Sequence, residues 1–434
     1  MGEGMQNNEQ KKYEFIKEKR KEVPVNKKKV AMQTGYVAVL ALLFGVIASF
    51  VIAFLQPKLE QMLYPKEDEY VSIPKDEPTE TETEVATDTQ APSTTEEGNE
   101  EAPMDMILWQ PTIDDYQALQ NQLYTIGREA NRFVVTVTGV QSDTDWFNNP
   151  YENRDEASGI IIANSSHELL ILTEKKVIAS AQEIYVTFID DTTVHATMKQ
   201  YDGNTGIAIL SVAFSELTQD TLNEITIAKL GNSLLVPQGA LAIAVGSPLG
   251  MNFSILTGNI TSTTNTISTV DANYNVFTTD IVASSSGSGA LLNVRGEVIG
   301  IMMQDYSRQS DANTLTAVSV SDLKALIEKL SNGNEVAYLG LGISTVTREI
   351  EKTYDIPKGV YIKEVKMDSP AMNAGLQSGD VITEMDGVTV FDEAAYERRL
   401  LQVRPGDKVR VIIKRQSSEG YVSIRCDVEA SRLQ

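Results

Sequence analysis

The chain has 434 residues, which is long enough for two or three domains with cores of their own. Its formal net charge of −23 argues against a nucleic-acid partner, because phosphate binding requires a basic surface. A single cysteine, Cys426, excludes an intramolecular disulfide and leaves no cysteine cluster for a metal. We therefore expect no metal site and no cofactor, and the two histidines, His167 and His195, are the only candidates for histidine-dependent chemistry.

The amino-terminal part has the pattern of a membrane anchor. Residues 1–29 contain nine Lys or Arg, and a long apolar run follows within 30–56. A stretch of about 20 apolar residues crosses a bilayer as a helix, and a basic flank stays on the cytoplasmic side. The pattern predicts a cytoplasmic basic tail over 1–29 and a single transmembrane helix over 30–56. The protein would then lie in the cell membrane with its C-terminal domains extracellular.

The next segment, 57–106, is rich in Glu, Thr, Pro and Ser. Such a composition buries too little apolar surface to offset the entropy of an ordered chain. Repulsion between its carboxylates favours an extended chain. We therefore predict a disordered acidic linker.

The remainder of the chain is predicted to be mainly β. A helical pattern over 114–128 is followed by many short runs rich in Val and Ile, separated by Gly, Asn, Asp and Pro. Short strands with frequent turn residues are typical of a β-sandwich or a β-barrel, and the pattern alone does not choose between the two.

Four segments carry a family resemblance that favours the barrel. They are Ala157–Ile162, Lys229–Ser233, Ala244–Gly250 and Thr279–Ile301. In this order and spacing they resemble segments of the HtrA family, whose members join a trypsin-fold serine protease domain to a PDZ domain. The resemblance implies a trypsin-like double β-barrel over 107–334.

The catalytic positions of that family are altered here. The resemblance places Lys176 where the family has its histidine and Gly206 where it has its aspartate. Serine catalysis requires a base within reach of the hydroxyl and a third group that orients the base. A charged lysine accepts no proton and glycine orients nothing, so the resemblance implies a degenerate triad.

The nucleophile position is ambiguous. A gap-free count back from Ala290 places Gly287 there, whereas one additional loop residue places Ser286 there. Either count leaves a serine at the family's preceding glycine, where a Cβ disfavours the turn of an oxyanion loop. A Ser286–Lys176 dyad stays open as an alternative, because burial can lower the pKa of a lysine enough for it to act as a base.

The carboxy-terminal residues 335–434 resemble a PDZ domain of α+β type. The segments Tyr338–Leu341 and Asp368–Ile382 match the carboxylate-binding loop and the signature of the HtrA-type PDZ domain. Convergent amides of such a loop bind a terminal carboxylate, and the adjoining strand pairs with an extended peptide. The resemblance implies that six residues bind peptide: Tyr338, Leu339, Gly340, Leu341, Tyr396 and Leu400.

Together these features indicate an HtrA-like, membrane-anchored protein with a degenerate triad at Lys176, Gly206 and Ser286 or Gly287. The first hypothesis is a pseudoprotease that binds polypeptide C-termini or unfolded protein in cell-surface quality control or scaffolding. The second is an active serine endopeptidase with a Ser-Lys site. The resemblance also implies a homotrimer as one candidate assembly.

Overall fold

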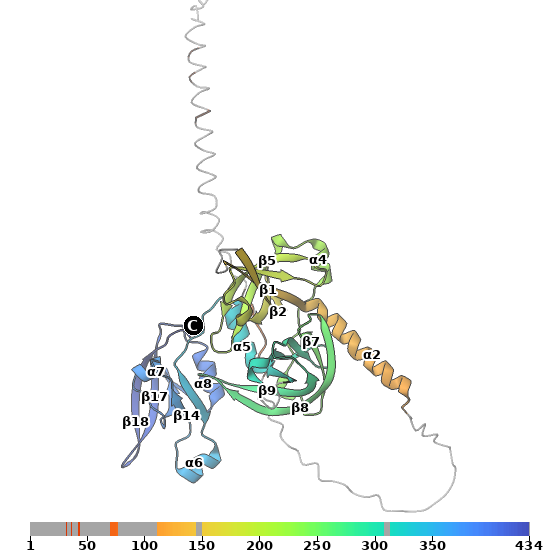
Figure 1. Cartoon of the computed structure of the whole chain (residues 1–434). Helices are drawn as coiled ribbons and strands as arrows, with labels where there is room; N and C mark the ends of the chain where they lie inside the picture. The colour runs from red at the N-terminus through yellow and green to blue at the C-terminus, as the bar shows by residue number, and fades with distance from the viewer. Residues whose placement is uncertain are drawn as a thin grey trace, which may run out of the picture. The chain divides into compact units, whose positions relative to one another are not determined.

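The computed structural model describes residues 70–76, 111–144, 150–307 and 313–433, together with four helical positions near the amino terminus (Figure 1). Every element named below belongs to one compact unit, 69–434. The predicted basic tail lies outside the described residues, and so does the predicted transmembrane segment apart from those four positions. Within the part of the chain that is described, no helix is both long enough and apolar enough to cross a membrane.

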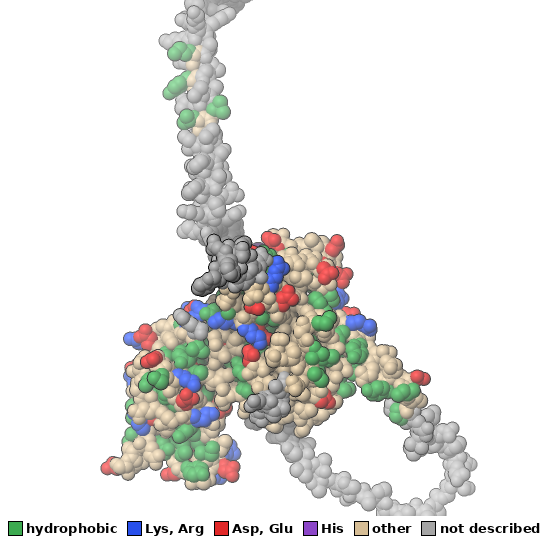
Figure 2. All heavy atoms as spheres, in the orientation of Figure 1, with side chains coloured by type: hydrophobic (Ala, Val, Ile, Leu, Met, Phe, Trp, Pro, Cys, Tyr) green, Lys and Arg blue, Asp and Glu red, His purple; other side chains and the backbone are tan. Residues whose placement is uncertain are grey.

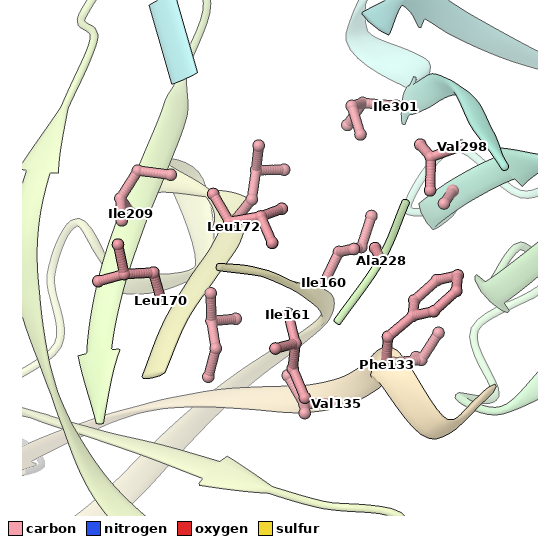
Figure 3. Packing of buried hydrophobic residues seen from close by; sticks show 14 of the residues in the cluster. Phe133, Val135, Ile160, Ile161, Leu170, Leu172, Ile209, Ala228, Val298 and Ile301 are labelled. Atoms are coloured by element: carbon pink, nitrogen blue, oxygen red, sulfur yellow. The ribbon is translucent and has the colours of Figure 1, made fainter. Parts of the chain in front are cut away.

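Six antiparallel strands close the first barrel in the order β1-β2-β3-β6-β5-β4. Their bounds are β1 (Val134–Thr144), β2 (Pro150–Asn164), β3 (Glu168–Glu174), β4 (Glu183–Thr187), β5 (Thr193–Tyr201) and β6 (Ile207–Ala213). β-Branched residues fit the pleated strands, and Ile160, Leu170 and Ile209 are fully buried among them (Figure 3).

A second closed barrel follows, in the order β10-β11-β12-β9-β8-β7. Its strands are β7 (Leu241–Ser247), β8 (Ser254–Ser268), β9 (Asn273–Val282), β10 (Ser288–Leu292), β11 (Val298–Met303) and β12 (Thr314–Ser319). Val298 and Ile301 of β11 belong to the same buried cluster as Ile160 and Ala228, so apolar packing joins the two barrels (Figure 3). The predicted mainly β, trypsin-like double barrel is confirmed.

Helix α2 (Ile113–Ala130) precedes the first barrel. Thr112 and Asp115 form a capping box that satisfies the first amides of the helix. The helix packs closely on β8, since a Cβ at Gly127 would lie 2.5 Å from the Ile255 side chain. Figure 2 shows hydrophobic side chains along the visible flank of α2, and four of its residues are exposed: Ile113, Tyr116, Leu119 and Tyr124.

Short helical turns connect the strands, and one longer helix follows the second barrel. The turns include α3 (Lys175–Ile178) after β3, α4 (Gln219–Glu224) and the 3₁₀ turn η4 (Gln304–Tyr306) after β11. The longer helix is α5 (Val320–Ser331), which buries Leu323, Ile327 and Leu330. These turns matter below because α3 and η4 belong to different barrels.

Part of the predicted linker is held against α5. Ile73 is buried, and its amide donates to Glu328 at 2.9 Å. The Asp76 carboxylate lies 2.7 Å from the Lys324 ammonium, whose side chain is only 5 % exposed. The segment 70–76 is therefore fixed by a buried apolar contact and a buried ion pair, whereas the rest of 57–106 lies outside the described residues.

The carboxy-terminal domain is a PDZ fold, as predicted. Its sheet has the order β13-β14-β15-β17-β18, with β16 paired to β15. The strands are β13 (Leu341–Thr345), β14 (Val360–Val365), β15 (Val381–Met385), β16 (Val388–Thr389), β17 (Lys408–Ser417) and β18 (Gly420–Glu429). The helices are α6 (Arg348–Tyr354), α7 (Pro370–Asn373) and α8 (Glu393–Leu400), the last of which is capped by the Asp392 side chain.

Candidate functional sites

Lys176 lies in α3, at the end of the first barrel's β3, and is held by two carboxylates. Its ammonium is 2.7 Å from Oε2 of Glu174, the residue immediately before the same turn. It also donates to both carboxylate oxygens of Asp305 in η4, at 3.4 Å each. Because η4 follows β11 of the second barrel, this ion cluster bridges the two barrels.

The two carboxylates keep Lys176 charged. Burial alone would lower the pKa of Lys176, but the hydrogen bond and charge of Glu174, with the charge of Asp305, raise that pKa above its usual value. Burial raises the pKa of Glu174, although Lys176 counteracts the effect. A protonated ammonium has no lone pair, so Lys176 in this arrangement cannot accept a proton from a serine hydroxyl.

Gly206 occupies a structural turn. Its φ is +75°, a left-handed conformation that favours glycine, and its carbonyl accepts the Lys175 amide at 2.7 Å. The nearby Asp202 carboxylate is buried and directed into its own loop, where it accepts the amide of Thr205 at 2.8 Å and its hydroxyl at 2.7 Å. This carboxylate therefore orients a loop, and its hydrogen bonds are to Thr205 and Asn204.

The loop before β10 contains both candidate nucleophile positions. Ser286 is exposed, and its hydroxyl lies 3.2 Å from that of Ser284. Within the described residues, no serine hydroxyl hydrogen-bonds the Lys176 ammonium, which contacts only Glu174 and Asp305. Among the hydrogen bonds of the described residues, the Ser286 hydroxyl thus has a serine and no base as its partner.

Two features of Gly287 disfavour a catalytic role for this position. Its amide donates to the Ser284 carbonyl at 2.9 Å, so this N–H is not available to an oxyanion. A Cβ at this position would lie 2.8 Å from the Pro248 carbonyl and 3.0 Å from that of Ser284. The loop therefore has no room for a serine here without a shift of backbone.

Ser288 and the two histidines make contacts elsewhere, away from the predicted triad positions. The buried Ser288 hydroxyl accepts the amide of Ser158 at 2.9 Å and so joins β10 to β2. His167 is exposed next to Ser166, and His195 is exposed with its ring edge-on to Tyr185. Neither histidine contacts the altered triad positions.

The PDZ carboxylate loop holds a carboxylate from the protease-type domain. The amides of Leu339 and Gly340 donate to Oδ2 of Asp271 at 2.8 Å each, and the amide of Leu341 donates to Oδ1 at 3.0 Å. Asp271 lies in the turn between β8 and β9, and it is only 6 % exposed. The amides predicted to bind a peptide terminus therefore bind a side chain of the same molecule.

Tyr396 of α8 completes this site. Its hydroxyl donates to Oδ1 of Asp271 at 2.7 Å, and the tyrosine is fully buried. Burial raises the pKa of Asp271, whereas the four donors, led by the Gly340 amide, lower it; the net shift is upward. Burial and the charge of Asp271 together raise the pKa of Tyr396 far above its usual value, so its hydroxyl remains a donor.

The other predicted peptide-binding residues surround this contact. Leu341 and Leu400 are buried, and Tyr338 is half-buried with its backbone paired to Ser431. Gly340 has a φ of +93°, and a Cβ there would lie 2.2 Å from that of Ser369, so the loop requires glycine. The predicted set is thus brought together, with Asp271 as the residue that sequence reasoning missed.

Two family models match the chain in this arrangement. The trypsin-like peptidase domain matches residues 157–301, and the PDZ domain matches residues 337–425. The serine protease Do-like HtrA of Lactobacillus helveticus is 29 % identical over 297 residues, which are 64 % of this chain and 70 % of the relative. The chain belongs to the HtrA-like, PDZ-containing serine protease family.

Further HtrA-like relatives are longer than the matched region. A probable periplasmic serine endoprotease of DegP-like type from Halomonas elongata is 31 % identical over 279 residues. The match covers 63 % of this chain and 56 % of that relative, so the chain spans little more than half its length. The solved HtrA-type protease AlgW with decapeptide aligns with a TM-score of 0.52 at 20 % identity, covering 71 % of this chain and 98 % of that one, which shows a shared fold.

Among the described residues, no group of three or more His, Cys, Asp or Glu side chains is placed to hold a metal ion.

Proposed function

We propose that this protein is a membrane-tethered, extracytoplasmic HtrA-like pseudoprotease. It binds polypeptide C-termini or unfolded protein through its PDZ domain, in cell-surface quality control or scaffolding. The observation that carries the pseudoprotease assignment is the ion cluster of Lys176 with Glu174 and Asp305. It fixes a cation where a proton acceptor is needed.

Three further features support the loss of catalysis. Gly206 forms a turn at the predicted aspartate position, the Gly287 amide donates to the Ser284 carbonyl, and the Ser286 hydroxyl hydrogen-bonds that of Ser284. A serine without base and oxyanion donors keeps little rate enhancement. The alternative, an endopeptidase that uses Ser286 and Lys176, would require Lys176 to leave both carboxylates and lose its proton.

Fluorophosphonate labelling of the purified full chain tests the assignment. We expect neither labelling nor hydrolysis of unfolded casein, and no change in Ser286→Ala. The serine protease Do-like HtrA of Bacillus subtilis, a relative 27 % identical to this chain, serves as the positive control. If the protein hydrolyses casein and both Ser286→Ala and Lys176→Ala abolish that activity, the pseudoprotease assignment is wrong and the protein is a Ser-Lys endopeptidase.

Peptide binding is supported by the PDZ loop itself. Three convergent amides and the Tyr396 hydroxyl form a receptor for one carboxylate. A charge-assisted hydrogen bond contributes about 1.5–3 kcal/mol, so amidation of a peptide terminus is expected to weaken binding by at least about tenfold. Equal affinity for free and amidated ends would contradict this mode of binding.

The location and assembly are inferred from sequence pattern, relatives and surface. The basic and apolar segments at 1–56 support a single-pass anchor with a cytoplasmic amino terminus, and the DegP-like relatives named as periplasmic support an extracytoplasmic site. The exposed apolar side chains of α2 support self-association, with a homotrimer as the candidate. Protease treatment of intact cells and sedimentation equilibrium of the full chain test the two inferences.

A further inference from the structure

We infer that Asp271 is an internal ligand of the PDZ domain, so that a polypeptide C-terminus must displace the β8–β9 turn in order to bind. This inference rests on the proposed peptide-binding function. In the described form of the protein, which we call closed, the Asp271 side chain already occupies the receptor for a terminal carboxylate.

The contacts of the Asp271 side chain are those expected of a terminal carboxylate. Both of its oxygens accept two donors each: Leu339 and Gly340 bond Oδ2, while Leu341 and Tyr396 bond Oδ1. A carboxylate has about four lone-pair sites, and here all are used. The receptor consequently has no donor left for a second carboxylate.

The Asp271 backbone reproduces a further part of peptide recognition. Its amide donates to the Leu341 carbonyl at 2.7 Å, at the start of the β13 edge. An extended peptide that adds to a sheet edge makes main-chain bonds of this kind. Asp271 has a φ of +60°, which an aspartate tolerates and which turns the chain back toward β9, whose first residue is Asn273.

Two residues outside the turn, Glu397 and Asn204, also hold it in place. The amide of Asn273 donates to the Glu397 carboxyl of α8 at 2.8 Å. On the other side, the Asn204 amide group donates to the Val270 carbonyl at 2.7 Å. Because the turn is covalently part of the chain, its effective concentration at the loop greatly favours it over a peptide in solution.

The external ligand that fits is the free C-terminus of an extended polypeptide. It offers the same carboxylate and main-chain amide as Asp271, together with further residues that can pair along β13. Strand β13 and the start of α8 are also joined by Thr345 and Glu393, each of whose amides donates to the other's side chain, at 2.8 and 3.0 Å. A bound terminus would therefore replace Asp271 first and then open this bridge.

A charge-removing substitution tests the inference. Asp271→Asn retains the shape and the left-handed backbone of the turn but weakens the bonds to the loop. Asp355→Asn is the matched control, because Asp355 is also left-handed, at a φ of +52°, and is exposed at the end of α6. The probes are fluorescent peptides that end in Leu, Val or Phe, each with a free and an amidated terminus.

An internal ligand lowers the apparent affinity for a peptide, because only the fraction of molecules with a free site can bind it. Removal of that ligand should restore the lost factor. We expect the full chain with Asp271→Asn to bind the free-ended peptides at least about tenfold more tightly than wild type, with no gain for the amidated ones and none for Asp355→Asn. Equal affinity of wild type and Asp271→Asn for the free-ended peptides would overturn the inference.

Amide hydrogen exchange tests whether Asp271 is an internal ligand even if no peptide binds. We expect the amides of Leu339, Gly340 and Leu341 to be protected in wild type and to exchange faster in Asp271→Asn, but not in Asp355→Asn. If the three amides lose protection in Asp271→Asn but no peptide binds, the proposed peptide-binding function is wrong and Asp271 is still an internal ligand. Unchanged protection of the three amides in Asp271→Asn would overturn the internal ligand, whatever the peptides do.

Discussion

Asn204 and Val270 hydrogen-bond each other in both directions. The Asn204 side-chain amide donates to the Val270 carbonyl at 2.7 Å, and the Val270 amide donates back to Oδ1 of Asn204 at 3.2 Å. Asn204 lies two residues before Gly206, the residue predicted to stand at the family's aspartate position, while Val270 adjoins Asp271. The loop that contains Asn204 and Gly206 thus supports the turn whose Asp271 side chain accepts the amides of the PDZ loop.

Substitution Asn204→Ala should loosen that turn from the protease side. The variant leaves the Val270 amide and carbonyl without their partner, which costs about 1–3 kcal/mol for part-buried groups. We expect a lower unfolding midpoint and tighter binding of free-ended peptides, by a smaller factor than for Asp271→Asn. Asn121→Ala is the control and should change neither quantity, because the Asn121 side chain is exposed and accepts a hydrogen bond from Gln117 of the same helix.

The ion pair of Asp76 and Lys324 should be the main attachment of the 70–76 segment. Asp76→Ala leaves the nearly buried Lys324 ammonium without its carboxylate, and loss of one partner of a buried pair costs about 3–5 kcal/mol. We expect a lower urea midpoint and faster proteolytic cleavage near the segment.

A second substitution distinguishes charge from packing at this attachment. In the double variant Asp76→Ala, Lys324→Met, an apolar side chain replaces the unpaired cation, so much of the stability should return. A single variant as stable as wild type would show that the segment is not bound through this pair.

Lys176 should stabilise the two barrels rather than catalyse. Lys176→Met removes the counter-charge of the buried Glu174, whose other oxygen, Oε1, already has no hydrogen-bond partner among the described residues. Since the lysine side chain is 41 % exposed, we expect a loss of about 1–3 kcal/mol in unfolding free energy, less than for a fully buried pair.

The control for Lys176 is another lysine of equal exposure. Lys366 pairs with Glu364 at 2.9 Å, and the two side chains are 41 % and 61 % exposed. Lys366→Met should change stability by no more than about 0.5 kcal/mol. Equal effects of the two substitutions in urea unfolding would argue against a structural role for the Lys176 cluster.

Local patterns predicted the elements well. The helical pattern over 114–128 corresponds to α2 (Ile113–Ala130), and the strand predicted to adjoin the carboxylate-binding loop corresponds to β13 (Leu341–Thr345). Hydrophobic period and turn residues act over a few positions, so they are visible in the sequence. The HtrA-type motifs then fixed the choice of a double barrel over a sandwich.

The decisive contacts of the sites were not visible in this way. Asp271 reaches amides that lie 68 to 70 positions later, and Lys176 meets Asp305 across 129 positions. An aspartate in a hairpin turn is ordinary in sequence, and only the tertiary fold gives it a receptor. The 70–76 segment had a weak signal, because Tyr70, Val71 and Ile73 interrupt an otherwise acidic run.

Glu397 should make stability depend on pH through the contact between its carboxyl and the Asn273 amide. Burial, only partly offset by that amide, raises the pKa of Glu397 from 4.5 to about 8. Between these two values the folded protein retains a proton that the unfolded chain has released. Stability from this group is therefore full below pH 4.5 and falls as the pH rises toward 8, by up to about 1.4 kcal/mol per pH unit.

The variant Glu397→Gln isolates this contribution. Glutamine keeps the acceptor for Asn273 and cannot ionise, so the difference in unfolding free energy between variant and wild type should grow between about pH 5 and about pH 8 and then level off. Urea unfolding at successive pH values measures that difference. Glu419→Gln, in the exposed turn between β17 and β18, should parallel wild type throughout. Parallel curves for Glu397→Gln and wild type would mean that Glu397 is already ionised in the folded protein, and the turn that carries Asp271 would then be held against a charged helix α8.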